Sequence, residues 1–213
     1  MNDVCWKPSP DRVRDANITA FMKWLADHGH VQVSDFEALY RYSIESPAEF
    51  WACAWDYFGV KGERGATSVE NPELMPGARW FPEARLNFAE NLLSRRDDHP
   101  AILFRSENGD RRELSYAELY RQVAATAAAL RSMGVSSGDR VAGFLPNLPE
   151  TVIAMLAASS LGAIWSSCSP DFGTRSVVDR LGQIQPKVLF CTDAYRYNGK
   201  THDCLDRIRE ITG

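Results

Sequence analysis

Several kinds of residue and segment are scarce in this chain of 213 residues, and each scarcity narrows what the chain does. There is no cationic excess, because 24 Lys and Arg residues face 28 Asp and Glu residues and the formal net charge is -4. A chain with this charge is not attracted to a nucleic-acid backbone or to an anionic lipid surface. We therefore expect neither nucleic acid nor a membrane as its partner.

Long apolar runs are also missing. The longest covers residues 151–165, contains Ser159, Ser160 and Gly162, and is shorter than the roughly 20 apolar residues that a helical membrane span needs. The first residues lack the basic region and apolar core of a secretory signal, which predicts a cytoplasmic protein.

Cysteine is sparse and scattered, with five residues and no Cys-x-x-Cys pair. An odd number at wide spacing favours free, buried thiols over disulfides or a zinc site. His28 and His30 flank Gly29 without a third ligand in the pattern, so we interpret them as a solvated turn. The sequence therefore predicts no metal site.

The chain does contain enough apolar residues, 45% of the total, to form one sizeable core or two modest ones. In its first part, three helices are predicted from their start signals: Asn17 as a cap, the Ser34/Glu37 capping-box spacing, and Ser46 followed by a proline. Their expected buried faces are Ile18, Phe21, Met22 and Leu25, then Phe36, Leu39 and Tyr40, then Trp51, Ala54, Trp55 and Phe58. A Pro/Gly-rich connector at 59–85 completes a helical extension that we predict to span residues 1–95.

Residues 96–213 show a different pattern, in which strands and helices alternate. Strands are expected at 101–104, 112–114, 141–145, 163–166 and 188–191, and helices after the Ser115/Glu118 box, near Pro149 and at 174–185. Strands that alternate with helices of this length form parallel neighbours through right-handed crossovers. The predicted fold class is therefore α/β: a helical amino-terminal extension followed by part of a doubly wound, mostly parallel sheet.

Ligands of such sheets bind beyond the carboxyl ends of the strands, which selects three loops. They are residues 146–149, residues 167–173 and residues 192–200. The second contains Ser169, Pro170 and Asp171 before a helix start, and the third contains Tyr197 and Lys200 with other aromatic and basic residues. Such loops offer backbone amides, aromatic faces and cations to a nucleotide, although a Ser-Pro-Asp cluster is more often just a helix cap.

Two other groups of residues have uneventful interpretations. The serines around Cys168 lack a Gly-x-Ser-x-Gly elbow and a nearby histidine, so no nucleophile is predicted there and Cys168 is interpreted as structural. Asp97 and Asp98 are adjacent in a polar stretch, whereas paired catalytic carboxylates need a defined separation and burial. We predict no catalytic residue in the chain.

Four segments carry a resemblance to a known family. Residues 76–93, 138–147, 158–173 and 195–200 resemble the acetoacetyl-CoA synthetases of the AMP-forming, adenylate-forming family, and the run Trp-Ser-Ser-Cys-Ser-Pro-Asp-Phe-Gly is the most specific part. The resemblance covers essentially the whole chain. It implies an ATP-dependent ligase that makes an acyl-adenylate and passes the acyl group to coenzyme A, with Mg²⁺ expected. It also implies that residues 96–213 are the first, incomplete part of the AMP-binding domain.

The same resemblance implies which residues bind coenzyme A. In related acetyl-CoA synthetases, the positions that match Ser169, Pro170, Asp171, Tyr197 and Lys200 lie against the nucleotide end of coenzyme A. This sequence departs from that pattern, because Pro170 and Asp171 replace glycines and Tyr197 replaces an arginine. Lys200 is one of only five lysines in the chain, which makes its place in a carboxyl-edge loop informative.

Other parts of the family's machinery have no counterpart in these residues. The chain has no Ser/Thr/Gly-rich phosphate loop, no ribose-binding aspartate motif and no carboxy-terminal domain with its catalytic lysine. We therefore expect an amino-terminal fragment of a ligase, inactive alone, whose partners are its small-molecule substrates and the remaining domains of the same enzyme. Two alternatives remain open: a non-catalytic module that binds a nucleotide or a partner, and a ligase for acetate, propionate or a longer 3-oxo acid.

Overall fold

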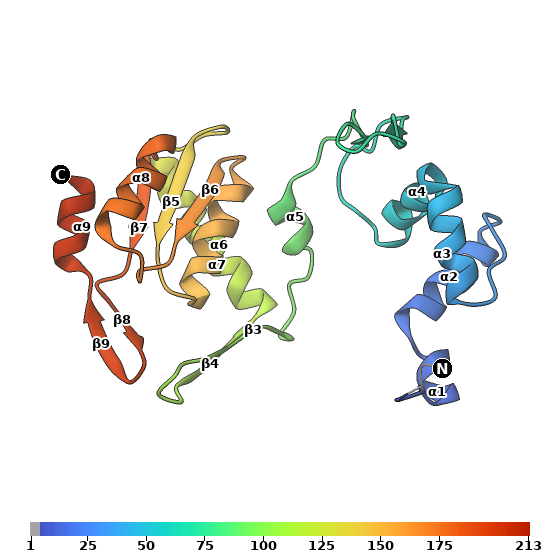
Figure 1. The fold of residues 1–213 in the computed structure, drawn as a ribbon, viewed down its shortest axis with the longest axis horizontal. Coiled ribbons are helices and arrows are strands. Elements are labelled where there is room, and N and C mark those ends of the chain that lie inside the picture. The colour runs from blue at the N-terminus through green and yellow to red at the C-terminus, as the bar shows by residue number, and fades with distance from the viewer. Residues whose placement is uncertain (1–4) are drawn as a thin grey trace. The chain divides into compact units, whose positions relative to one another are not determined.

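The computed structural model describes residues 5–213 and divides the chain into two compact units, with the division between Leu86 and Asn87 (Figure 1). The boundary predicted from sequence, 95/96, lies further along the chain, after a short helix that belongs to the second unit. Among the described residues, the first unit has one hydrophobic cluster and the second unit has two.

The first unit is helical. It contains α1 (Pro10–Arg14), α2 (Asn17–Asp27), α3 (Phe36–Glu45) and α4 (Pro47–Tyr57). Its core is a small cluster from the last three helices, made of Phe21, Leu25, Leu39, Cys53 and Ala54. The three helices predicted from the sequence are α2, α3 and α4.

Two of the predicted helix starts need correction. Asn17 is the first helical residue and not the cap, which is Ala16 and makes no side-chain bond. In α3 the cap is Asp35, whose carboxylate accepts the backbone N–H of Ala38 at 2.8 Å, while the Ser34 hydroxyl donates to Asp35. An aspartate one residue closer to the helix takes the capping role because its longer reach and charge suit the free amides.

The predicted buried faces are also only partly right. Leu39 and Ala54 are buried as expected, but Phe36, Tyr40, Trp51 and Phe58 are exposed. Helical periodicity marks an apolar stripe wider than the part that this small cluster covers.

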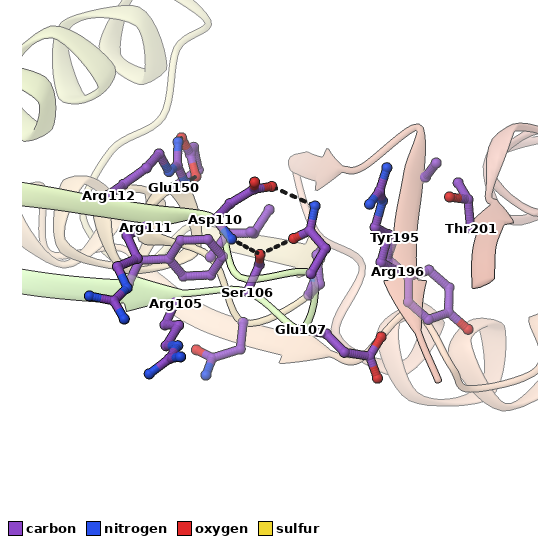
Figure 2. A pocket seen from close by; sticks show the side chains of 16 residues that line it. Arg105, Ser106, Glu107, Asp110, Arg111, Arg112, Glu150, Tyr195, Arg196 and Thr201 are labelled. Atoms are coloured by element: carbon purple, nitrogen blue, oxygen red, sulfur yellow. Dashed lines mark hydrogen bonds and ion pairs between the residues drawn. The ribbon is translucent and has the colours of Figure 1, made fainter. Parts of the chain in front are cut away.

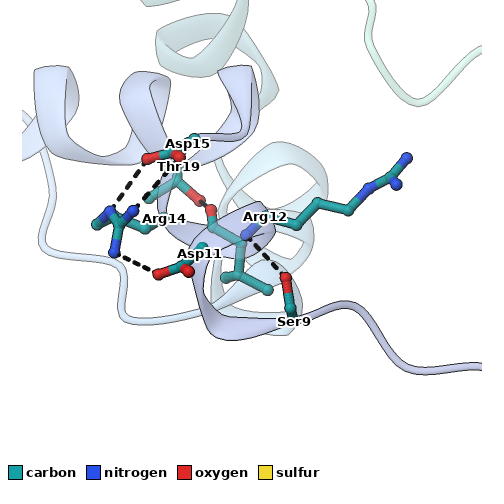
Figure 3. Close-up of polar contacts among 7 residues, drawn as sticks. Ser9, Asp11, Arg12, Arg14, Asp15 and Thr19 are labelled. Atoms are coloured by element: carbon teal, nitrogen blue, oxygen red, sulfur yellow. Dashed lines mark hydrogen bonds and ion pairs between the residues drawn. The ribbon is translucent and has the colours of Figure 1, made fainter.

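Helix α1, which the sequence did not predict, is held by local polar contacts (Figure 3). The Ser9 hydroxyl accepts the backbone N–H of Arg12, and the Arg14 guanidinium bonds Asp11 at 2.7 Å and Asp15 at 3.0 Å. The Thr19 hydroxyl of α2 donates to the carbonyl of Val13 at 2.6 Å, which connects α1 to the next helix. These contacts are exposed, so they fix local geometry and add little stability.

The connector at 59–85 is almost entirely irregular, as predicted, except for the paired strands β1 (Val69–Glu70) and β2 (Arg79–Trp80). Glu83 fixes its path, because its carboxylate accepts the backbone amides of Ala66 and Thr67 at 2.7 and 3.0 Å and the Thr67 hydroxyl at 2.9 Å. These bonds, that from the Thr67 amide above all, hold the pKa of Glu83 below its usual value.

The second unit contains the α/β part of the chain. Its elements in order are α5 (Phe88–Leu92), β3 (Pro100–Arg105), β4 (Arg111–Ser115), α6 (Tyr116–Ser132), β5 (Arg140–Phe144), α7 (Pro149–Ser160), β6 (Ile164–Cys168), α8 (Thr174–Ile184), β7 (Val188–Cys191), β8 (Ala194–Tyr197), β9 (Lys200–Asp203) and α9 (Leu205–Thr212). Each strand and helix predicted between 101 and 191 is present, whereas α5 and the β8–β9 pair were not predicted. The Asn87 side chain caps α5 and also donates to the Ser159 carbonyl at the end of α7, at 2.9 Å.

A three-stranded parallel sheet lies at the centre of this unit, in the order β6-β5-β7. Val141 of β5 is opposite Trp165 on one side and Val188 on the other. The chain crosses from β5 to β6 in one direction and from β6 past β5 to β7 in the other. Right-handed crossovers in opposite directions place their helices on opposite faces, which gives the doubly wound α/β fold predicted from the sequence.

Two hydrophobic clusters, one on each face of the sheet, agree with this placement of the helices. Val141 packs with buried residues of α6 and α7, whereas Ala142 and Phe144 pack with Val177 and Leu181 of α8 and with residues of α9. Successive side chains of a strand point to opposite faces, so β5 contributes alternately to both clusters.

Helix α6 agrees with its prediction in detail. The Ser115 hydroxyl accepts the Glu118 backbone N–H at 3.2 Å, and the Glu118 carboxylate accepts the Ser115 N–H at 2.9 Å. The four residues predicted for the apolar face are all buried, namely Leu119, Val123, Ala127 and Leu130. The helix ends at Ser132, and Gly134 two residues later has a φ of 80°, the left-handed conformation expected just after a helix.

Candidate functional site

An open cavity of about 980 Å³ lies at the carboxyl edge of the sheet in the second unit (Figure 2). Three segments line it: the end and turn of the β3–β4 hairpin, the loop after β5, and the β8–β9 hairpin. The lining residues are Phe104, Arg105, Ser106, Glu107, Asn108, Asp110, Arg111, Arg112, Pro146, Asn147, Leu148, Glu150, Ala194, Tyr195, Arg196 and Thr201. Two of the three loops selected from the sequence therefore contribute to one cavity.

The loop after β5 is short and fixed. Phe144 is fully buried at the end of the strand, and the Thr151 hydroxyl donates to the Pro146 carbonyl at 2.7 Å. Helix α7 begins at Pro149, where a missing backbone N–H costs nothing. This part of the cavity is a rigid wall.

The β3–β4 hairpin is attached to α7 by an ion pair between Arg112 and Glu150. Both guanidinium nitrogens bond the two carboxylate oxygens, each at 2.7 Å. The hydrogen bond from Arg112 holds the pKa of Glu150 below its usual value. Arg112 is therefore neutralised and is not available to an anionic ligand.

Two other arginines of this hairpin lie directly opposite each other. Arg105 of β3 pairs in register with Arg111 of β4, and both are exposed. Like charges at opposed positions of an antiparallel pair repel each other. Neither has an ion-pair partner within residues 5–213, and the same is true of Arg196 on β8. The cavity thus contains three cations that could receive a phosphate or carboxylate.

The segment 192–200 was predicted to be a loop, and this is wrong, because it forms most of the β8–β9 hairpin. Its two-residue turn is Asn198-Gly199, with φ of 51° and 71°. Tyr197 and Lys200 are opposite each other beside this turn, and both side chains are exposed. An Asn-Gly pair between aromatic and β-branched residues is a strong hairpin signal, so the sequence did contain the information.

The other predicted ligand residues lie after β6. Ser169 and Asp171 are exposed, whereas Pro170 is fully buried. None of the five residues predicted to bind coenzyme A is among those that line the cavity. The structure thus places Tyr197 and Lys200 at the hairpin turn next to it and the Ser169–Asp171 loop at the end of the neighbouring strand.

Arg207 of α9 connects these two segments, and no sequence pattern identified it. Its guanidinium donates to the Pro170 carbonyl at 2.6 Å, with longer contacts of 3.5 Å to the carbonyls of Phe172 and Asp203. It also lies 5.9 Å from the centre of the Tyr195 ring. One partly buried side chain therefore fixes the loop after β6 to the hairpin.

The thiols near this edge are not activated. Burial raises the pKa of Cys191 and of Cys204, which disfavours the thiolate that a nucleophile needs. Cys168 is buried as predicted. His28 and His30, predicted to lie in a solvated turn, both stack on Trp24, at 4.3 and 5.4 Å between ring centres. Across residues 5–213 no three His, Cys, Asp or Glu side chains form a group that could hold a metal ion.

None of the helices described between residues 5 and 213 combines the length and apolar character of a membrane span. The groups assembled at the carboxyl edge include arginines, aromatic rings and the carboxylates of Glu107, Asp110 and Glu150, with Lys200 at the turn beside the cavity. The cations and rings among them can bind and orient a phosphorylated ligand.

Comparison with known proteins agrees with this architecture. Residues 88–213 match the family described as AMP-binding enzyme, and residues 36–92 match the acetyl-coenzyme A synthetase N-terminus. Acetoacetyl-CoA synthetases of Rhizobium meliloti and Gallus gallus are 41% and 40% identical to 97% and 99% of this chain, which corresponds to 32% of each of those proteins.

A solved structure of the acetoacetyl-CoA synthetase from Streptomyces lividans is 44% identical, with a TM-score of 0.88 over 97% of this chain and 32% of that one. The chain therefore spans about a third of the length of the relatives it matches. With more than half of its residues matching the family, the chain belongs to the AMP-binding enzymes.

Proposed function

We propose that this chain is the amino-terminal part of an acetoacetate–CoA ligase. The whole enzyme converts acetoacetate, ATP and coenzyme A into acetoacetyl-CoA, AMP and pyrophosphate. The observation that carries the proposal is the series of acetoacetyl-CoA synthetases at 38–41% identity along nearly the whole chain. We further propose that the enzyme acts in the cytoplasm, in ketone-body and lipid metabolism.

In this proposal the present residues bind coenzyme A and do not carry out bond-breaking chemistry. Lys200 and Tyr197 at the hairpin turn, and Ser169, Pro170 and Asp171 after β6, contact the nucleotide end of coenzyme A. This assignment is supported by the position of both segments at the carboxyl edge of one parallel sheet, where such ligands bind. Lys200 adds an exposed cation without an ion pair among the described residues, which suits a phosphate.

The remaining requirements are assigned to other residues of the enzyme. Mg²⁺ would accompany ATP and screen its phosphates, but the described residues offer no suitable ligand group, so we assign it no site in this stretch. The phosphate loop and the catalytic lysine are likewise expected outside these 213 residues. We therefore propose that the chain alone forms no thioester.

Two measurements test the proposal. The first compares AMP release by the full-length protein and by the 213-residue chain, with acetoacetate, ATP and coenzyme A. We expect turnover only from the full-length protein, and turnover by the short chain would contradict the assignment of the chemistry. The second is calorimetric titration of coenzyme A into the chain, with Lys200→Ala expected to weaken binding.

Lys23→Ala is the matched control, because Lys23 is an exposed lysine of α2 in the other unit. Equal affinity of the Lys200 and Lys23 variants would mean that Lys200 does not contact coenzyme A.

A different acid substrate is the second candidate. A malonamoyl-CoA synthetase from Penicillium aethiopicum is 35% identical over 98% of this chain, so similar amino-terminal sequences occur with a different acyl group. A panel of acetoacetate, acetate, propionate and malonamate, compared by kcat/KM in the full-length protein, separates the two candidates.

A further inference from the structure

The turn of the β8–β9 hairpin already holds an anion, which is a carboxylate of the chain itself. Glu107, in the turn of the β3–β4 hairpin, accepts the backbone N–H of Asn198 at 2.8 Å with one oxygen and that of Gly199 at 3.1 Å with the other. Figure 2 shows the Glu107 side chain extending from its turn toward the β8–β9 hairpin. The two hairpins are thus joined by a carboxylate at consecutive amides.

The conformation of the turn explains why it accepts an anion. Asn198 and Gly199 both have positive φ, 51° and 71°. In turns of this kind successive backbone N–H groups point to the same side and form a small concave site for an anion. A phosphate presents the same pair of oxygens as a carboxylate, with a third oxygen and additional charge.

The residues around the turn supply charge that Glu107 does not use. Arg196 and Lys200 are on the two strands beside the turn, both exposed, and neither forms an ion pair with any described residue. Glu107 forms no ion pair with either of them, and its carboxylate accepts the two backbone amides. Arg196 is opposite Thr201 and Lys200 is opposite Tyr197, so the two cations project from opposite faces of the hairpin. Each face beside the turn therefore offers one cation that the present occupant leaves unpaired.

We propose that Glu107 is a built-in competitor for phosphate at the β8–β9 turn, the turn to which the proposed function already assigns the nucleotide end of coenzyme A. The carboxylate occupies the amides of Asn198 and Gly199 when no ligand is bound, and it leaves when a phosphate binds there beside Arg196 on one face of the hairpin or Lys200 on the other. Glu107 thus sets the affinity of the site. This deepens the proposed function where the phosphate belongs to coenzyme A, but the site itself requires only a phosphate.

Competition predicts a gain of affinity when the charge at position 107 is removed. Glu107→Gln keeps the length of the side chain but replaces charge-assisted hydrogen bonds with weaker neutral ones. We expect about tenfold tighter binding of a phosphate ligand, which corresponds to about 1.4 kcal/mol. If Glu107 instead serves only to hold the turn in shape, the same substitution should weaken binding or leave it unchanged.

The test uses calorimetric titration of the 213-residue chain with coenzyme A, 3′-dephospho-coenzyme A and inorganic pyrophosphate. Glu113→Gln is the matched control, because it removes the same charge from an exposed position of the same hairpin that is not at the turn. Tighter binding of pyrophosphate to Glu107→Gln, and not to Glu113→Gln, supports the competitor. A preference for coenzyme A over its 3′-dephospho form identifies the 3′-phosphate as the source.

A second readout locates the effect. In ¹H–¹⁵N spectra, the amide signals of Asn198 and Gly199 should move when pyrophosphate is added to Glu107→Gln, and the same signals of the parent chain should move only at higher concentration. Binding that does not tighten in Glu107→Gln, a matching gain in Glu113→Gln, or absence of binding in every variant overturns the proposal. Ligase activity is not part of this test, so the proposed function can fail while the phosphate site stands.

Discussion

Replacing Arg207 with methionine should destabilise the second unit by about 2–4 kcal/mol. The largest loss is the 2.6 Å hydrogen bond from the guanidinium to the Pro170 carbonyl, since a bond from a charged donor contributes about 1.5–3 kcal/mol. The guanidinium also lies 5.8 and 5.9 Å from the ring centres of Phe144 and Tyr195, near the outer limit for a cation–π contact, which adds about 0.5–1 kcal/mol. Methionine keeps an apolar stem of similar length, so little packing is lost.

The control is Arg209→Met on the same helix. Arg209 pairs with Asp206 at 2.7 Å, but their side chains are 75% and 88% exposed, and such a pair contributes about 0–1 kcal/mol. Urea unfolding followed by circular dichroism gives the two free-energy changes. Chymotrypsin cleavage after Phe172 reports separately on the loop after β6, and it should accelerate in the Arg207 variant. Equal destabilisation by both substitutions, with unchanged cleavage, would refute the role of Arg207 as an anchor.

Four further substitutions test the second unit. Ser115→Ala removes the cap of α6 and should lower the free energy of unfolding by about 1 kcal/mol in urea titrations. Hydrogen bonds from Ser136 and Lys187 lower the pKa of Asp139 from 3.8 to about 2. The stability that the ionised carboxylate contributes is therefore complete above pH 4 and is lost as the pH falls toward 2. Unfolding curves measured at each pH should show that the stability difference between the parent and Asp139→Asn shrinks over that window. Gly143→Ala would place a Cβ 2.8 Å from the Trp165 ring and should destabilise the unit by about 1–3 kcal/mol. Gly182→Ala, in open space within α8, should stabilise the unit by about 0.5–1 kcal/mol. Thermal unfolding in which both substitutions shift the stability in the same direction would contradict the packing described.

The parts of the fold that were predicted correctly are those specified by neighbouring residues. Helix α6 has a reciprocal cap at Ser115 and Glu118, an apolar residue at each turn, and a terminal glycine, and all three signals lie within one segment. The buried residues of the first unit were harder to predict, because the apolar faces of α3 and α4 are wider than the cluster that covers them. Periodicity alone did not separate buried Leu39 from exposed Tyr40.

The candidate site was predicted only as a region. The carboxyl-edge rule located the loops after β5, β6 and β7, because strand order and loop position follow from the alternating pattern. The contacts that organise these loops connect residues far apart in the chain: Glu107 with Asn198, and Arg207 with Pro170. No local pattern encodes such pairs, since each depends on how two separate hairpins or helices are brought together by the sheet.

The alternation of β5 between two hydrophobic clusters has a consequence for how the second unit opens. Val141 belongs to the cluster of α6 and α7, and Ala142 and Phe144 belong to that of α8 and α9. Fluctuations that detach α9 leave Val141 and the cluster of α6 and α7 in place. The amide hydrogens of α9 can therefore exchange through a local opening. The amides of β5, bonded to a strand on either side, are released only when both layers separate, and they should therefore be the slowest to exchange with deuterium.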